Sequence, residues 1–204
     1  MGDVYERLIE QWSIDEDGDQ LDPRAVFGPD ARTILEIGCG RGDLAVSYAV
    51  SHPDDALMAI DVHTRGIANI LAGIESRHLE NVRVIEGDAQ VFVRRLPPRS
   101  IDEMWVFFPD PWPKVRHRNR RLLRQDLIAT LTEPLKVGGV LRLATDIEDY
   151  ARTAADAVAS SGRFSEPVKG RPSWRVETVF ERRGREEGRA AIDVAWTRVG
   201  ETCC

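Results

Sequence analysis

One carboxylate, Asp110, stands among three prolines and directly before a cluster of bases in the stretch FFPDPWPKVRHRNRR, residues 107–121. Pro109, Pro111 and Pro113 fix φ at alternate positions and remove amide donors, so the loop is stiff and cannot extend a sheet. A stiff loop holds a carboxylate in place without an ordering cost at each turnover. We therefore predict that Asp110 is the catalytic group of an active-site loop.

The bases that follow Asp110 are interrupted by no acid from residue 114 to residue 124: they are Lys114, Arg116, Arg118, Arg120, Arg121 and Arg124, with His117 among them. The planar fork of arginine suits phosphate recognition. We expect RNA phosphate contacts from Arg116, Arg118, Arg120 and Arg121. A second basic set comprises Arg171, Arg175, Arg182, Arg183, Arg185 and Arg189. The alternative for such runs is a solvated face. Trp112 either stacks on a base or covers the core.

A glycine loop, Gly38-Cys39-Gly40-Arg41-Gly42, precedes a helix that begins with Asp43. A dinucleotide fingerprint would need its third glycine at position 43. An acid at a helix start also repels a pyrophosphate, which the N-terminus of a helix normally attracts. The spacing therefore favours a nucleoside ligand without phosphates, although a simple tight turn is the alternative.

Further carboxylates fall in or at the ends of successive predicted strands: Glu36, Asp61, Asp88 and Asp110. Asp61 is placed to accept both hydroxyls of a ribose, and Asp88 to accept a bond from an adenine amino group. Acids suit a sulfonium cation better than a phosphate. The layout is typical of doubly wound methyltransferases that use S-adenosylmethionine.

The elements that must position these residues alternate between strand and helix. Buried strands are predicted at 33–38, 56–61, 82–87, 101–108 and 140–145, with two more at 164–167 and 192–199. Helices are predicted at 44–51, 64–77, 121–133 and 147–160, with a turn at Gly138-Gly139. This order predicts an α/β fold: a doubly wound, mostly parallel seven-stranded sheet with helices on both faces.

The charge of the chain is unevenly distributed. Residues 1–22 hold eight acids and one base, so their net charge is −7. Because the net charge of the whole chain is −6, the remaining residues sum to +1. We expect residues 1–22 to be an acidic, partly disordered segment and residues 23–204 to form a single domain. Three cysteines, two of them adjacent at Cys203 and Cys204, make no disulfide framework, and we expect a cytoplasmic protein with no membrane span. The four histidines show no ligand spacing, so no metal is expected.

Beyond these patterns, the chain resembles the tRNA (guanine-N7) methyltransferases. The motif FFPDPWPKxRHxxRR is present as Phe107 to Arg121, with supporting matches at 35–38, 60–63, 87–89, 144–146 and 178–184. The resemblance covers roughly residues 33–197 and implies a Rossmann-like class I fold. It implies cofactor binding by Glu36, Gly38, Gly40, Gly42, Asp61, Asp88, Ala89 and Asp110. It also implies guanosine contacts from Lys114, Asp146, Thr178, Phe180 and Glu181. The chain departs from the family pattern at Asp61, Asn119 and Val179, which leaves room for another RNA target.

Guanine N7 carries a lone pair and no proton, so methylation there needs alignment and charge stabilisation rather than a general base. A carboxylate on the guanine N1–H and N2–H would bind more strongly as positive charge develops on the purine. We assign this role to Asp110, with Asp146 and Glu181 as competitors. N7 faces a groove of A-form RNA that is too narrow to enter, so the target guanosine is expected in a loop or displaced from its stack. The resemblance implies a guanosine in the variable loop of tRNA.

Two other functions remain open from the sequence. One is methylation of another RNA, or of an exocyclic or amide nitrogen, and another is RNA binding without catalysis. An NAD-dependent dehydrogenase is disfavoured by Asp43. The sequence is compatible with a monomer or a homodimer.

Overall fold

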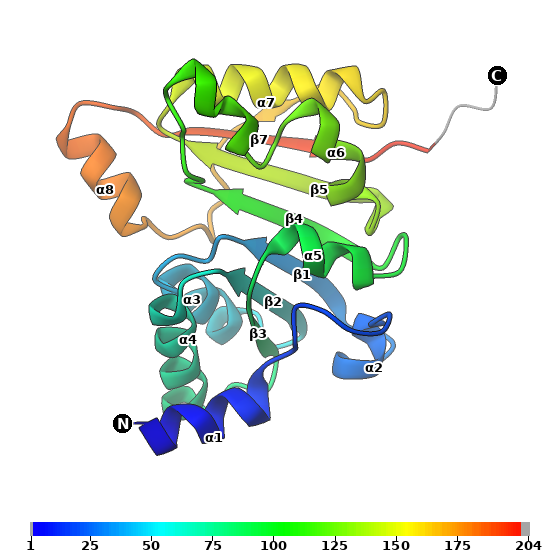
Figure 1. Ribbon diagram of the computed structural model, residues 1–204, viewed down its shortest axis with the longest axis vertical. Helices are drawn as coiled ribbons and strands as arrows, with labels where there is room; N and C mark the ends of the chain where they lie inside the picture. Colours follow the sequence, from blue (N-terminus) through cyan, green and yellow to red (C-terminus); the bar gives the residue numbers. More distant parts are fainter. Residues whose placement is uncertain (1, 201–204) are drawn as a thin grey trace.

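The computed structural model describes residues 2–200, with side chains from residue 4 onward, so Cys203 and Cys204 lie outside the described residues. A seven-stranded sheet crosses the molecule in the order β3-β2-β1-β4-β5-β7-β6 (Figure 1). The strands are β1 Arg32–Ile37, β2 Asp55–Asp61, β3 Val82–Glu86, β4 Ile101–Phe107, β5 Leu135–Thr145, β6 Val168–Lys169 and β7 Ile192–Thr197. The first five are parallel, β7 pairs antiparallel with β5, and β6 pairs antiparallel with β7. The predicted doubly wound, mostly parallel sheet is confirmed.

Helices cover both faces of the sheet (Figure 1). They are α1 Gly2–Trp12, α2 Pro23–Phe27, α3 Asp43–Ser51, α4 Thr64–Arg77, α5 Ala89–Phe92, α6 Gln125–Thr132, α7 Glu148–Ser160 and α8 Val179–Glu186, with short 3-10 helices η1 Val93–Arg95 and η2 Val115–Arg120. One core layer joins the sheet to α1, α3 and α4, and the other joins it to α5, α6 and α7. Each fully buried Leu or Ile in these layers contributes about 1.5–3 kcal/mol. Apolar burial on both faces explains why the inner strands read as continuous apolar runs.

Three predicted elements differ in detail. The helix expected at 121–133 begins only at Gln125, because Arg121 turns inward and is buried. The strand expected at 164–167 is a single bridge between Phe164 and Arg198, followed by the two-residue β6. The expected turn at Gly138-Gly139 is a bulge within β5, where Gly138 has a φ of 82°.

The N-terminal segment packs on the domain, which differs from the solvated head expected from its charge. Leu8 on α1 is 4% exposed, and Ser13 forms a parallel bridge with Val84 at the edge of the sheet. Arg95 donates hydrogen bonds to the main-chain oxygens of Asp15 and Asp19. The acid count concealed an apolar helix face, since Leu8 is accompanied by partly buried Tyr5, Ile9 and Trp12. Among the described residues, no helix is long and apolar enough to cross a membrane.

Candidate active site

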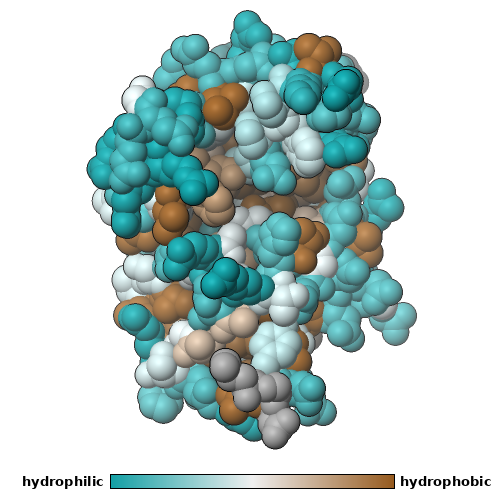
Figure 2. Space-filling view, turned by 60° about the vertical axis from the view of Figure 1, so that its left-hand side comes forward, coloured by the Kyte–Doolittle hydropathy of each residue, from teal (hydrophilic) through white to brown (hydrophobic). Residues whose placement is uncertain are grey.

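A cavity of about 680 Å³ lies beyond the carboxyl ends of the parallel strands, where ligands bind in open α/β sheets. Its lining comes from the ends of β1, β2 and β4, the loop after β5, and the start of α8. The view in Figure 2, which brings the left-hand side of Figure 1 forward, shows a hollow with hydrophobic groups in its depth and hydrophilic residues around it. The topology thus gathers at one edge residues as far apart in the chain as Glu36 and Arg189.

The glycine loop after β1 forms one wall of this cavity. Gly38, Gly40 and Gly42 have φ values of 77°, 57° and 77°, a region that residues other than glycine rarely adopt. The N–H of Gly40 donates to Oδ2 of Asp61 at 2.8 Å, which ties the loop to the end of β2. Gly42 does not line the cavity, because it faces Ile70 of α4. The sequence missed Gly66 of α4: a Cβ there would overlap the carbonyl oxygen of Gly40.

Glu36 lies on the floor of the cavity and is 3% exposed. Burial, and secondarily the charge of Asp61, raise the pKa of its carboxyl to about 8. Its Oε2 atom is buried without a hydrogen-bond partner. A buried, unpaired carboxylate oxygen is costly, and a cationic ligand in the cavity would both pair with it and favour its ionised form. The donor set therefore fits S-adenosylmethionine, whose sulfonium and amino groups are positive.

The second and third strands supply the next acids. Asp61 already accepts bonds from the N–H groups of Gly40 and His63, so its carboxylate is fixed and 8% exposed. Asp88 lines the cavity beside Ala89 and caps α5 by accepting from the N–H of Gln90 at 2.7 Å. Both acids thus lie where the sequence predicts them, each held in one orientation.

A carboxylate that sequence reasoning missed reaches this region from the N-terminal segment. Glu16 accepts a hydrogen bond from the main-chain N–H of Asp88 and lies against Gly87. These residues are 72 positions apart, so no local pattern links them. The segment of residues 13–22 therefore braces the third strand end.

The loop after β4 carries Asp110, which lines the cavity and is exposed. Two residues of this loop, Phe108 and Trp112, have positive φ values of 49° and 40°, which is uncommon for side chains of this size. The N–H of Phe108 donates to the carbonyl oxygen of Ala144 on β5 at 2.7 Å. The guanidinium of Arg120 lies 4.8 Å from the ring centroid of Trp112. The loop is thus held in a conformation that its local sequence does not favour.

The residues expected at the guanosine differ in placement. Asp146, Thr178 and Phe180 line the cavity, and Asp146 accepts from Nε of Arg189 at 2.7 Å. Lys114 does not line it and is exposed. Glu181 turns away into the protein, where Arg171 and Arg175 bind its carboxylate at 2.6 and 2.8 Å. The proposed competition of Glu181 for the guanine edge is therefore wrong for this structure, since its oxygens face arginines behind the cavity.

The predicted phosphate contacts also separate into two groups. Arg116 and Arg120 are exposed, and Arg120 lines the mouth of the cavity. Arg118 is partly buried and pairs with Asp149 at 2.9 Å. Arg121 is 2% exposed, with bonds to the carbonyl of Pro111 and to Asp149. The phosphate role assigned to Arg121 is therefore wrong: its guanidinium is a structural brace between the Asp110 loop and α7.

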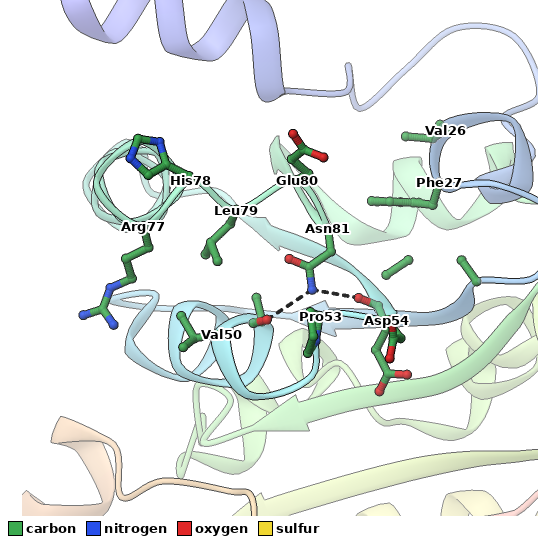
Figure 3. Close-up of a pocket in the computed structure, with 14 residues that line it drawn as sticks. Val26, Phe27, Val50, Pro53, Asp54, Arg77, His78, Leu79, Glu80 and Asn81 are labelled. Atoms are coloured by element: carbon green, nitrogen blue, oxygen red, sulfur yellow. Dashed lines mark hydrogen bonds between the residues drawn. The ribbon is translucent and has the colours of Figure 1, made fainter.

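A second hollow of about 660 Å³ lies at the opposite edge, between α2, α3 and the end of α4 (Figure 3). There Asn81 donates to the main-chain carbonyls of Ala49 and Asp55 at 3.2 and 2.9 Å (Figure 3). These bonds join loops around the start of β2. Of these two hollows, the first has features of an active site, because it holds the unpaired Oε2 of Glu36 and the strained loop.

Comparisons with known proteins identify the family of this chain. A family model described as a putative methyltransferase matches residues 30–194. The tRNA (guanine-N(7)-)-methyltransferase of Nitrosomonas europaea is 39% identical over 199 residues, covering 96% of this chain and 89% of that protein. The chain belongs to the tRNA (guanine-N(7)-)-methyltransferase family. The Streptomyces avermitilis relative of the same name is 38% identical and covers 97% of this chain and 70% of its own length.

Solved structures show the same fold at low sequence identity. The 16S rRNA methyltransferase KamB superposes with a TM-score of 0.67 and 16% identity, covering 93% of this chain and 99% of that one. A 16S rRNA (adenine(1408)-N(1))-methyltransferase from Catenulisporales acidiphilia, solved with its cosubstrate, gives 0.63 and 15%. The family resemblance and the class I methyltransferase fold predicted from the sequence are confirmed. Among the described residues, no group of three or more metal-ligating side chains occurs.

Proposed function

We propose that this chain transfers a methyl group from S-adenosylmethionine to N7 of a guanosine in the variable loop of tRNA. Membership of the tRNA (guanine-N(7)-)-methyltransferase family supports the reaction and the substrate class. The observation that carries the choice of donor is the buried, unpaired oxygen of Glu36 at the floor of the cavity. A cation is the ligand that this group favours.

When bound, S-adenosylmethionine supplies an electrophilic methyl group. Asp61 and Asp88 are positioned for the ribose hydroxyls and the adenine amino group, and the glycine loop permits close approach of the backbone. The carboxylate of Glu36, on the floor of the cavity, compensates the positive charge of the donor. These roles need no proton transfer from the protein to the donor.

Asp110 performs the role that remains, at the rim of the same cavity. Its carboxylate accepts hydrogen bonds from N1–H and N2–H of the guanine and holds N7 toward the methyl group. As N7 forms its new bond, the purine becomes positive and these hydrogen bonds strengthen, so the carboxylate stabilises the transition state more than the ground state. The stiff, strained loop keeps the carboxylate in that orientation. Asp146 is the second acid on this rim, although Arg189 already binds it.

The tRNA would reach the rim through its phosphates, which Arg116 and Arg120 are exposed to contact. We also expect a cytoplasmic enzyme, because the three cysteines make no disulfide framework.

The test is incubation of the purified protein with methyl-labelled donor and unmodified tRNA, followed by nuclease digestion and mass mapping. Label in 7-methylguanosine from the variable loop supports the proposal. Label in a different nucleoside, or in 7-methylguanosine from another stem or loop, contradicts the site of methylation proposed here.

A further inference from the structure

Arg175 is a fully buried cation behind the active-site cavity. Its side chain is 0% exposed, although the sequence groups it with the basic residues of the tail. Arg175 lies four positions before the first residue of α8. Its main-chain carbonyl oxygen accepts hydrogen bonds from Nε and Nη2 of Arg171 at 3.0 and 2.8 Å, which anchors this segment. A buried arginine is retained only where its donors are satisfied.

The guanidinium of Arg175 joins two consecutive elements, α8 and β7. Its Nη1 and Nη2 donate to Glu181 of α8 at 2.8 and 3.2 Å. Its Nε and Nη2 donate to the two oxygens of Asp193 on β7 at 2.7 and 2.8 Å. Burial by itself lowers the pKa of Arg175, but the hydrogen bonds to Glu181 and Asp193 raise it above its usual value, so the cation persists. With Arg171 also on Glu181, two cations balance two carboxylates.

The same guanidinium also contacts the active-site loop. Its central carbon lies 5.6 Å from the ring centroids of both Phe107 and Phe108. Phe108 is the residue with a φ of 49°, two positions before Asp110. On the other side, the first turn of α8 places the ring of Phe180 so that one edge carbon lies 3.2 Å from the position a Cβ of Gly40 would take. Arg175 therefore contacts both walls between which a guanine would enter.

We propose that Arg175 is a positioning residue for methyl transfer, which fixes α8 relative to the Asp110 loop by one bidentate guanidinium. The inference rests on the function proposed above. Lysine keeps the charge but has no planar fork, so it cannot hold Glu181 and Asp193 together while lying over the ring of Phe108. Misplacement by about 1 Å at a reacting centre costs on the order of 100-fold in rate. Glu36, Asp61 and Asp88, the acids expected at the donor, lie on β1, at the end of β2 and after β3, so donor affinity is expected to be unaffected.

The experiment compares the wild-type protein with Arg175→Lys and with Ile74→Val, a core change on α4 away from this cluster. The methylation rate constant is measured in single turnovers with saturating donor and tRNA, at a temperature where all three are folded. The donor dissociation constant is measured by calorimetry. We expect Arg175→Lys to lower the rate constant at least about 10-fold, with donor affinity unchanged within about twofold. Ile74→Val should change neither.

A rate constant for Arg175→Lys within about twofold of the wild type, measured on folded protein, would overturn the inference. If Arg175→Lys does not fold, Asp193→Asn is used in its place, because Asp193 contacts Arg175 and does not line the active-site cavity. The proposal requires the same fall in rate, and an unchanged rate overturns it. An inactive wild type would instead contradict the proposed function, so the two failures are distinguishable.

Discussion

The main-chain N–H of Gly40 donates to Oδ2 of Asp61 across 2.8 Å, which binds the glycine loop of the first strand to the acid of the second. The other side of the same peptide region is fixed by Gly66, where α4 approaches the carbonyl of Gly40 without room for a side chain. The glycine loop is therefore held from two directions, by a hydrogen bond and by close packing. We expect the affinity for the methyl donor to depend on both.

Gly66→Ala tests the packing side of this arrangement. The added methyl group must displace the Gly40 carbonyl, which moves the loop that faces the donor. We expect donor affinity to fall at least about 10-fold, measured by calorimetry. The control is Gly162→Ala, at a position with a φ of 64° and open space, where strain is added far from the cavity. Equal donor affinity in the wild type and Gly66→Ala would contradict this role for α4.

Glu36 predicts a dependence of stability on pH. Its carboxyl has an ordinary pKa of 4.5 when exposed and about 8 when folded. Between these values the folded state holds a proton that the unfolded chain has lost, so the stability from this group falls as pH rises through that window. The full effect is on the order of 5 kcal/mol. Glu36→Gln removes it, so the melting temperature of the variant should gain on that of the wild type from pH 5 to pH 9.

Asp43→Asn is the matched control for Glu36→Gln, since Asp43 also lines the cavity but its side chain is 55% exposed. The difference in melting temperature between Asp43→Asn and the wild type should stay constant over the same pH range. A flat difference for Glu36→Gln as well would show that Glu36 is ionised in the free protein.

Arg120 and Arg121 predict opposite outcomes although they are neighbours. Replacing exposed Arg116 and Arg120 with alanine should reduce the slope of log affinity for tRNA against log salt by about 1.5, as expected for two lost phosphate contacts. Arg121→Ala should leave the slope unchanged and lower the melting temperature by about 5 °C, because a buried brace is lost. Filter binding and thermal melts give both readouts. An unaltered slope in the double variant would exclude these residues as phosphate contacts.

The sequence predicted the parts of this site that depend on local pattern. Apolar runs bounded by turns located the inner strands, and the acids at their ends then fell at one edge because parallel strands end together. Contacts between residues that are far apart in the chain could not be predicted from the sequence. Whether Arg121 is buried depends on Asp149 of α7, and the orientation of Glu181 depends on Arg175, which also binds Asp193 of β7. Gly66 reads as an ordinary helix residue until α4 is seen against the glycine loop.

Charge counting misled at the N-terminus for a related reason. Residues 1–22 do contain many acids, but Leu8 and its apolar neighbours form one face of α1, which is buried in a core layer of the domain. Composition averages over the faces of a helix, whereas packing depends on one face.

Asp110→Asn tests the central claim most directly, because the amide keeps the shape of the carboxylate and removes its charge. In single turnovers with labelled S-adenosylmethionine and unmodified tRNA, we predict that the rate of 7-methylguanosine formation falls at least about 100-fold, while calorimetry shows donor binding within about threefold of the wild type. Formation of 7-methylguanosine by the Asp110→Asn variant at the wild-type rate would contradict the account.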